Sequence, residues 1–474
     1  MKNLALLVMF SSWSVFICGQ TPIRAGAAKV NITPPFGTII NGDFLPSYAA
    51  EIHDSLYARA LAFDNGSERF VFIVVDNMTI DVHLINMVKQ VIQTESGLHP
   101  GQVMISSTHA HSTGSVIETA TVQADYSYRI YLPGRIAMAA SLALKNMQLA
   151  KVAWGHINVP KHVSCRRWYM KQGFPMINPF GVEEKVWMNP PPGSEFLDRP
   201  AGPVDPQVTF LAVKSLSDKW ISLLANYSTH YAGGFPSDVI SADYYGEIDL
   251  QLKQKLKAGS GFVGIMSNGT SGDVNTFDFR LNKNYPAGDY EKMRLIAGDI
   301  TDSITANLSR ARWSEKPVFR TAYEEIVVNR RQPSADILDW ATKRVRETDF
   351  TKLGTAEKAS DDIKSLYALD IVKLDFYEPL SYKLPLEAVR IGEGTIGTIP
   401  DEIFAETGLK IKKGVKTPFY CTITLANGQF GYVPPEEQFL LGGYETWLCS
   451  GSLLETGAEK KISGSIISLV NSLQ

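Results

Sequence analysis

The 474-residue sequence predicts an α/β fold: a layered mixed β-sheet flanked by helices. The prediction rests on apolar runs of strand length and on the segments of helical spacing between them. Residues 70–75 are apolar throughout, as in a strand buried on both faces. Residues 84–94 have helical spacing, and 103–107 form the next apolar run. Such strand–helix–strand alternation is typical of layered folds whose ligands gather at strand ends.

The remaining elements follow from breakers and periodicity. Asp64-Asn65-Gly66 is a strong turn signal. Further strands are expected at 26–33, 56–63, 69–75, 208–213, 220–224 and 261–266, and helices at 135–147, 335–346 and 356–368. Residues 165–205 are rich in Pro, Gly, Trp, Tyr and Arg without clear periodicity, which indicates a functional loop or lid.

Composition narrows the class of protein. The net charge is -3, which argues against a nucleic-acid binder. Lys2 precedes a mostly apolar run over 4–17, so we expect a signal peptide at 1–19, export, and no transmembrane segment in the mature chain. Lipid anchoring through Cys18 stays open. Residues 20–474 are expected to form one catalytic domain.

The cysteines outside the signal segment are too few for a disulfide framework. They are Cys165, Cys421 and Cys449, and whether Cys421 and Cys449 are bridged stays open. Cys-x-x-Cys is absent, so a metal ion would be held by imidazole, carboxylate or other oxygen ligands.

Histidines follow two of the expected strands. His109 and His111 come directly after the strand at 103–107, and His230 comes just past the strand at 220–224. A His-x-His pair in a strand places both imidazoles on one face. Catalytic zinc takes two or three imidazoles and an oxygen ligand, with one position left for water. The pattern therefore predicts a zinc site built from the imidazoles of His109, His111 and His230; polar strand-end histidines are the alternative.

Two acidic residues and one loop are further candidates for supporting this site. Asp243 is a candidate for orienting the His230 region, and Asp76, at a strand end, is a weaker one. The loop at 267–275 combines small residues with Asn and Asp, which suits either a ligand site or a simple turn.

Several short motifs occur together in a fixed order. They are Thr108-His109-Ala110-His111-Ser112, His230, Gly272-Asp273-Val274-Asn275, Ile399-Pro400-Asp401-Glu402 and Gly431-Tyr432-Val433. In this order the chain resembles the catalytic domain of the neutral/alkaline, non-lysosomal ceramidase family, from about Gly26 to Tyr444. The resemblance implies Zn²⁺ bound by His109, His230, Glu402 and Tyr432, and hydrolysis of the N-acyl bond of a lipid.

The sequence departs from that family in three places. Asn275 stands where the family motif has a serine that is important for activity, and an amide cannot act as a hydroxyl nucleophile. The family's C-terminal β-sandwich is not expected here. Arg166 and Arg167, beside Trp168 and Tyr169, occupy the place of a substrate-facing arginine loop. They suit an anionic ligand such as a uronic-acid sugar, or else form a solvated basic loop.

Three functions follow. The preferred one is an exported zinc hydrolase that cleaves an N-acyl bond with metal-activated water, with His111, Asn275, Arg166 and Arg167 serving the substrate or the chemistry. The second is a metal-dependent lyase, esterase or deacylase acting on an acidic glycan. The third is a non-catalytic binding homologue. The expected partner is thus a small-molecule, lipid or oligosaccharide substrate. The hydrolase comes first because the metal ligands are better supported than any substrate.

Overall fold

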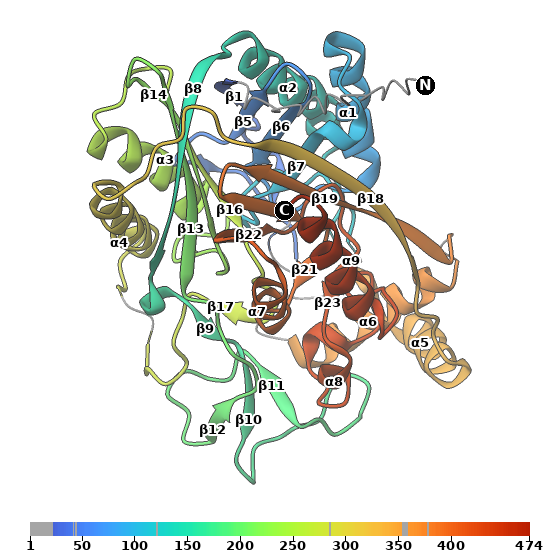
Figure 1. Cartoon of the computed structure of the whole chain (residues 1–474). Coiled ribbons are helices and arrows are strands. Elements are labelled where there is room, and N and C mark those ends of the chain that lie inside the picture. Colours follow the sequence, from blue (N-terminus) through green and yellow to red (C-terminus); the bar gives the residue numbers. More distant parts are fainter. Residues whose placement is uncertain are drawn as a thin grey trace, which may run out of the picture.

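Two stacked β-sheets with helices on both outer sides form the body of the chain (Figure 1). This computed structural model describes residues 22–40, 42, 45–119, 122–283, 286–352, 359–376 and 379–474. The larger sheet has eight strands in the order β16-β14-β13-β8-β1-β5-β6-β7, and the smaller has four in the order β18-β19-β20-β22. The mixed sheet and flanking helices confirm the predicted fold class.

The large sheet combines hairpins with two parallel crossovers. Its strands are β1 (Ile23–Asn31), β5 (Tyr57–Asp64), β6 (Arg69–Val75), β7 (Val103–Ser107), β8 (Gln148–Asn158), β13 (Gln207–Ser215), β14 (Trp220–Tyr227) and β16 (Val263–Asn268). β5 and β6 form the hairpin predicted from the Asp-Asn-Gly turn. β6 and β7 are parallel, as are β14 and β16, so each pair needs a helical crossover.

Four helices cover one face of this sheet: α1 (Val82–Ser96), α2 (Tyr126–Lys145), α3 (Asp243–Lys255) and α4 (Glu291–Leu308). α1 begins where the Asp81 side chain accepts from the Leu84 N–H, and ends at Gly97 in the left-handed conformation (φ 72°). α1 and α2 pack on β1, β5 and β6, whereas α3 and α4 pack on β8, β13 and β14. Each crossover brings the carboxyl ends of its two parallel strands side by side, β6 with β7 and β14 with β16.

The second face of the large sheet carries the smaller sheet instead of helices. Its strands are β18 (Phe319–Asn329), β19 (Ser381–Ile391), β20 (Gly394–Thr398) and β22 (Phe419–Ile423). Phe319, Val389 and Ile396 pack against Phe72 and neighbouring side chains of the large sheet. The outer face of the smaller sheet packs on α9 (Ala458–Ser472) and is joined there by α7 (Ala405–Gly414). The helix–sheet–sheet–helix layering was not predicted.

Two expected helices differ from the structure in their bounds. The helix expected at 135–147 begins at Tyr126, because Asp125 caps it by accepting from the Tyr128 N–H, and Pro133 lies inside it. Proline removes one intrahelical hydrogen bond, but Pro133 is buried, and that packing offsets the loss. The helix expected at 356–368 is α6 (Ala359–Asp375), which pairs with α5 (Ala335–Glu347).

Residues 165–205 are more ordered than a loop. They contain a three-stranded sheet in the order β11-β10-β12, with β10 (Arg167–Met170), β11 (Val186–Met188) and β12 (Leu197–Pro200). Two-residue strands complete the region around the site: β9 (Ser164–Cys165), β17 (Val274–Asn275), β21 (Glu402–Ile403) and β23 (Tyr432–Val433). The remaining short elements are β2 (Ile39–Ile40), β3 (Ser47–Tyr48), β4 (Glu51–Ile52), β15 (Val239–Ile240) and α8 (Glu436–Phe439).

The structure bears on the predictions about membrane-spanning helices and the cysteines, but not on the signal peptide. The expected signal peptide at 1–19, Cys18 included, lies outside the described residues and stays a prediction. Within the described ranges, no helix combines the length and the apolar character that crossing a membrane requires. Cys165, Cys421 and Cys449 are free thiols, so Cys421 and Cys449 are not bridged.

Candidate metal centre

His109 occupies a strained turn directly after β7. Its backbone is left-handed (φ 71°), which is unfavourable for a residue with a Cβ. Two contacts hold it: its N–H donates to the Asn77 carbonyl at 3.0 Å, and its Nδ1 lies 2.9 Å from the Met78 carbonyl. Strain of this kind persists where surrounding contacts over-determine a functional residue.

His230 reaches the same point from the end of β14. The Asp243 carboxylate does not touch this imidazole; it accepts from the backbone N–H groups of Ala232 and Gly233, just past the histidine. Burial raises the pKa of Asp243 to about 6, although these backbone bonds lower it. Asp243 therefore anchors the turn that carries His230, which agrees with the orienting role expected for that region.

The three histidines present the same ring nitrogen to one another. Nδ1 of His109, His111 and His230 each faces a backbone carbonyl, of Met78, Gly42 and Ser271 respectively. A carbonyl can only accept, so each Nδ1 carries the proton and each Nε2 keeps its lone pair. These imidazoles lie within 4.8 Å of one another in their ligand atoms, and Nε2 of His109 and of His111 are 3.4 Å apart. Converging lone pairs repel unless a cation lies between them.

Glu402 and Tyr432 come from two other segments and are brought together by a short parallel ladder. They are direct partners in the β21–β23 pair. Glu402 Oε2 lies 3.3 Å from His109 Nε2. This oxygen is buried, and no described residue donates a hydrogen bond to it. Close packing of Gly272 on this ladder admits no side chain, since a Cβ there would lie 2.7 Å from the Glu402 carbonyl oxygen.

These distances fit a metal ion. Two ligand atoms about 2.0–2.1 Å from zinc in tetrahedral geometry are about 3.3–3.4 Å apart. The His109–Glu402 separation, 3.3 Å, matches that edge length. The unpartnered Glu402 oxygen is the second indication of a metal ion. A buried carboxylate oxygen without a hydrogen-bond donor or a cation raises the free energy of the folded state. The His109, His111 and His230 group could thus hold a metal ion, with Glu402 beside it.

The electrostatics also suit a cation. Burial, and then the neighbouring His109, lower the pKa values of His111 and His230 well below the usual imidazole range, so both rings are neutral at pH 7. Burial, and then the Glu402 charge, raise the pKa of the Tyr432 phenol, which Arg166 partly opposes. Neutral imidazoles are the form that binds metal.

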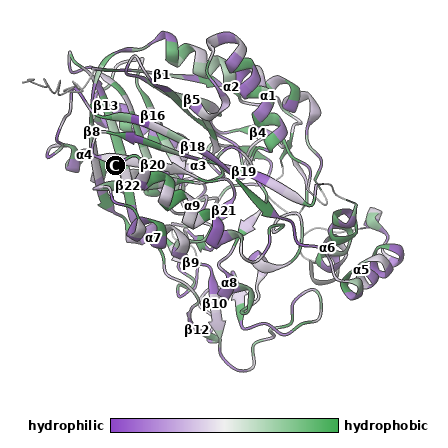
Figure 2. Cartoon of the chain, turned by 45° about the vertical axis from the view of Figure 1, so that its right-hand side comes forward, coloured by the Kyte–Doolittle hydropathy of each residue, from purple (hydrophilic) through white to green (hydrophobic). Residues whose placement is uncertain are grey.

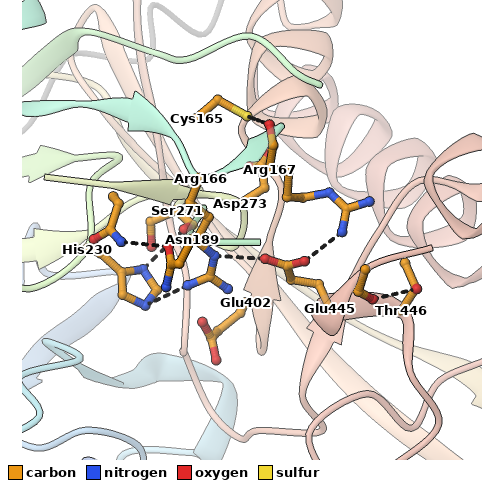
Figure 3. A network of polar contacts seen from close by, with 12 residues as sticks. Cys165, Arg166, Arg167, Asn189, His230, Ser271, Asp273, Glu402, Glu445 and Thr446 are labelled. Atoms are coloured by element: carbon orange, nitrogen blue, oxygen red, sulfur yellow. Dashed lines mark hydrogen bonds and ion pairs between the residues drawn. The ribbon is translucent and has the colours of Figure 1, made fainter. Parts of the chain in front are cut away.

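Arg166 and Arg167 share one buried carboxylate, that of Glu445 (Figure 3). Arg166 Nε lies 2.8 Å from one Glu445 oxygen, and Arg167 Nη1 lies 2.6 Å from the other. Arg166 continues toward the histidines: its Nη1 is 3.3 Å from His230 Nε2, and its guanidinium carbon lies 5.2 Å from the centre of the Tyr432 ring. Arg166 therefore reaches the metal centre.

Arg167, unlike Arg166, does not reach the cavity at the histidines. Its Nη2 donates to Gln438 and to the Gly442 carbonyl, and Arg167 is absent from the lining of the metal-centre cavity. Both arginines are buried and charge-paired, so the region is not a solvated basic loop. The two guanidinium groups instead hold the segments around the site together through Glu445, Gln438 and the Gly442 carbonyl.

The candidate metal centre opens into a cavity of about 390 Å³. His109, His111, Arg166, His230, Asn275, Glu402 and Tyr432 all line it. Asn275 lies opposite Ser164 in the β9–β17 pair, and its Nδ2 donates to Asn189 Oδ1 at 3.1 Å. Asn189 is also in the lining. Two carboxamides thus stand beside the histidines.

The sequence missed several residues of the site. Glu445 and Asn189 lie in segments with no motif, and Tyr231 stacks on His111 with ring centres 3.9 Å apart. A signal for Tyr231 was available, because it follows His230 directly. Asp76 serves elsewhere: its carboxylate pairs with buried Arg59 at 2.6 Å and is absent from the cavity lining.

Comparison with known proteins places this arrangement in a known fold. No protein-family model matches the chain, and no curated protein matches it. Among solved structures, a neutral ceramidase from Pseudomonas aeruginosa superposes with a TM-score of 0.70 at 14% identity, covering 96% of this chain and 74% of that one. A ceramidase complexed with C2 gives a TM-score of 0.69 at 14% identity, covering 96% and 75%. The chain therefore has the neutral ceramidase fold, as its motifs predicted.

Proposed function

We propose that the chain is a zinc-dependent amidohydrolase that cleaves an N-acyl bond, with His109, His230, Glu402 and Tyr432 as the metal ligands. The observation that carries the proposal is the gathering of the His109, His111 and His230 ligand atoms within 4.8 Å of one another, beside an unpartnered Glu402 oxygen. The neutral ceramidase fold supports the choice of an N-acyl substrate. When bound in such a site, zinc polarises a carbonyl and lowers the pKa of a water molecule.

The chain's own residues have separate tasks in this reaction. Hydrolysis forms a C–O bond to the acyl carbon, breaks the C–N bond and transfers a proton to the leaving nitrogen. His111 is neutral and its Nδ1 faces the Gly42 carbonyl, so its Nε2 is the atom that takes a proton from water and returns it to the amine. Stacking on Tyr231 fixes the ring plane.

Arg166 stabilises negative charge on the acyl oxygen. Its Nη2 is buried, and no described residue accepts from it. A preorganised donor of this kind favours the transition state over the neutral carbonyl. Glu445 and, through it, Arg167 hold the guanidinium in place. Asn275 and Asn189 supply amide groups that hydrogen-bond the substrate but cannot form an acyl-enzyme ester.

Metal analysis of the purified protein tests the ligand assignment. We expect about one zinc per chain. His230→Ala should lose the metal, whereas His111→Ala should keep it and lose N-acyl hydrolysis; His83→Ala, on the exposed side of α1, is the matched control. Loss of metal from His111→Ala would make His111 a ligand, and a metal-free wild-type protein would refute the proposal.

A further inference from the structure

The outward side of α2 carries apolar side chains where a surface helix normally carries polar ones. Ile130, Tyr131, Met138 and Leu142 are exposed by 78%, 47%, 45% and 38%. We call these four residues the α2 patch. Their spacings of four, seven and eight residues place them on one side of the helix. None of them belongs to the site described above.

The other side of α2 is apolar as well, and it is buried against β1, β5 and β6. A helix that is apolar all round is ordinarily covered on every side, by protein or by lipid. The large sheet covers only one side of α2, so the α2 patch is suited to contact with a partner surface.

The charges of α2 indicate the chemistry of that partner. The helix contains Arg129, Arg135 and Lys145 but no aspartate or glutamate. Arg129 is paired with Asp81. Arg135 lies over the ring of Tyr131, with 5.8 Å from the guanidinium carbon to the ring centre, and Lys145 is exposed in the last turn. Among the described residues, no carboxylate forms an ion pair with Arg135 or Lys145. The partner is therefore expected to be apolar and anionic.

An anionic lipid bilayer matches this combination better than a second copy of the chain does. Apolar side chains enter the boundary between head groups and acyl chains, while lysine and arginine meet the phosphates. A two-fold dimer would place the α2 patch against itself, and so bring together two sets of Arg135 and Lys145. Glu95 and Glu118, which lie beside α2, already accept hydrogen bonds from hydroxyl groups of this helix.

The described chain begins beside the same helix. Arg24, in the first turn of the chain into β1, donates from Nη2 to the Met147 carbonyl just past the end of α2, at 2.7 Å. Residues 1–21, which include Cys18, therefore join the fold next to α2. Figure 2 shows α1 and α2 at one end of the molecule and β10 and β12 at the opposite end. A lipid anchor at the start of the chain would thus hold the α2 end to a bilayer.

We propose that the α2 patch is a docking surface for an anionic lipid bilayer. Its four apolar side chains insert at the level of the head groups, and Arg135 and Lys145 contact the phosphates. The chain then lies on the bilayer without crossing it, with β10 and β12 directed away from the lipid. The proposal concerns where the protein acts and does not rest on the proposed hydrolysis.

Co-sedimentation of the full chain with vesicles tests this docking surface. The probes are vesicles of equal parts phosphatidylcholine and phosphatidylglycerol, and vesicles of phosphatidylcholine alone. Each of the two basic residues is worth about a fivefold change in affinity at an anionic surface, so the mixed vesicles should bind the chain about 25-fold more tightly. Ile130→Glu combined with Leu142→Glu should weaken binding to the mixed vesicles about 100-fold or more, since each buried apolar side chain contributes about tenfold or more. Leu250→Glu combined with Phe376→Glu, at exposed apolar residues elsewhere, is the matched control and should keep the binding.

Every variant keeps residues 1–21, so a difference between variants cannot come from the start of the chain. Urea unfolding checks each fold, and Lys145→Glu, at an exposed position, supplies a second test by lowering the affinity for mixed vesicles about 25-fold. A wild type that does not bind mixed vesicles overturns the proposal, as does undiminished binding in the folded Ile130→Glu, Leu142→Glu variant or in Lys145→Glu. Self-association that the same double variant abolishes, without vesicle binding, assigns the patch to a second copy and also overturns it. Vesicle binding without N-acyl hydrolysis supports the docking surface and contradicts only the proposed function.

Discussion

Replacing Glu445 with glutamine tests how the chain holds Arg166 at the metal centre. Glu445 is fully buried, and its two oxygens pair with Arg166 at 2.8 Å and Arg167 at 2.6 Å. Burial alone would raise the pKa of Glu445, but the charges of Arg167 and Arg166 hold it below its usual value. Glutamine is similar in size and can accept from one guanidinium, but its amide donor faces the other.

The expected loss of stability follows from the charges left behind. Removing one partner of a buried ion pair costs about 3–5 kcal/mol. Arg167 keeps Gln438 and the Gly442 carbonyl as acceptors, so the loss should lie near the lower end, about 3 kcal/mol. The pKa of Glu445 is lower in the folded protein than in the unfolded chain. The ionised carboxylate therefore adds to the free energy of unfolding when the pH is above the unfolded-state pKa. This stabilisation is lost as the pH falls through the folded-state pKa.

Urea unfolding followed by circular dichroism measures this effect. Asp198→Asn removes an exposed pair with Arg199 and should cost less than about 1 kcal/mol. Glu445→Gln should also reduce turnover more than metal content, since Arg166 loses its anchor. A stability loss no larger than that of Asp198→Asn would refute the view that this carboxylate neutralises a buried guanidinium pair.

Three further predictions concern Asp273, Asn275 and Asp76. Asp273→Asn should flatten the pH dependence of stability. Burial raises the pKa of Asp273 from 3.8 to about 7, so the free energy of unfolding of the wild type should fall by on the order of 4 kcal/mol between pH 4 and pH 7. An equally steep fall with pH in the variant, measured by urea unfolding, would contradict this. Asn275→Ser should release Asn189 and raise kcat/KM for N-acylsphingosine about tenfold or more, as measured by amine release; no gain would show that the amide does not limit that substrate. Asp76→Asn should destabilise by about 3 kcal/mol, because Arg59 keeps only Asp249 at 3.8 Å, yet zinc content should not change; loss of zinc would place Asp76 in the site.

Local sequence patterns were enough to predict many of the strands and helices. The strands at 69–75 and 103–107 match the apolar runs because a strand buried on both faces has no polar positions. The N-terminal part of α2 was missed, since Pro133 normally ends a helix and only the packing of that residue shows otherwise. The second sheet was missed because strand spacing does not specify which layer covers a face.

For the site, the sequence by itself determined which residues can bind a metal ion. His109 and His230 follow apolar strands, and the place of a residue after a strand is a local property. Glu402 and Tyr432 are proposed as ligands because of the ordered motifs alone. Only the tertiary structure decided that these segments meet and that Glu445 pairs with Arg166 and holds it in place. The physical reason is that these contacts join residues distant in the chain, and burial and charge pairing exist only once the layers have packed.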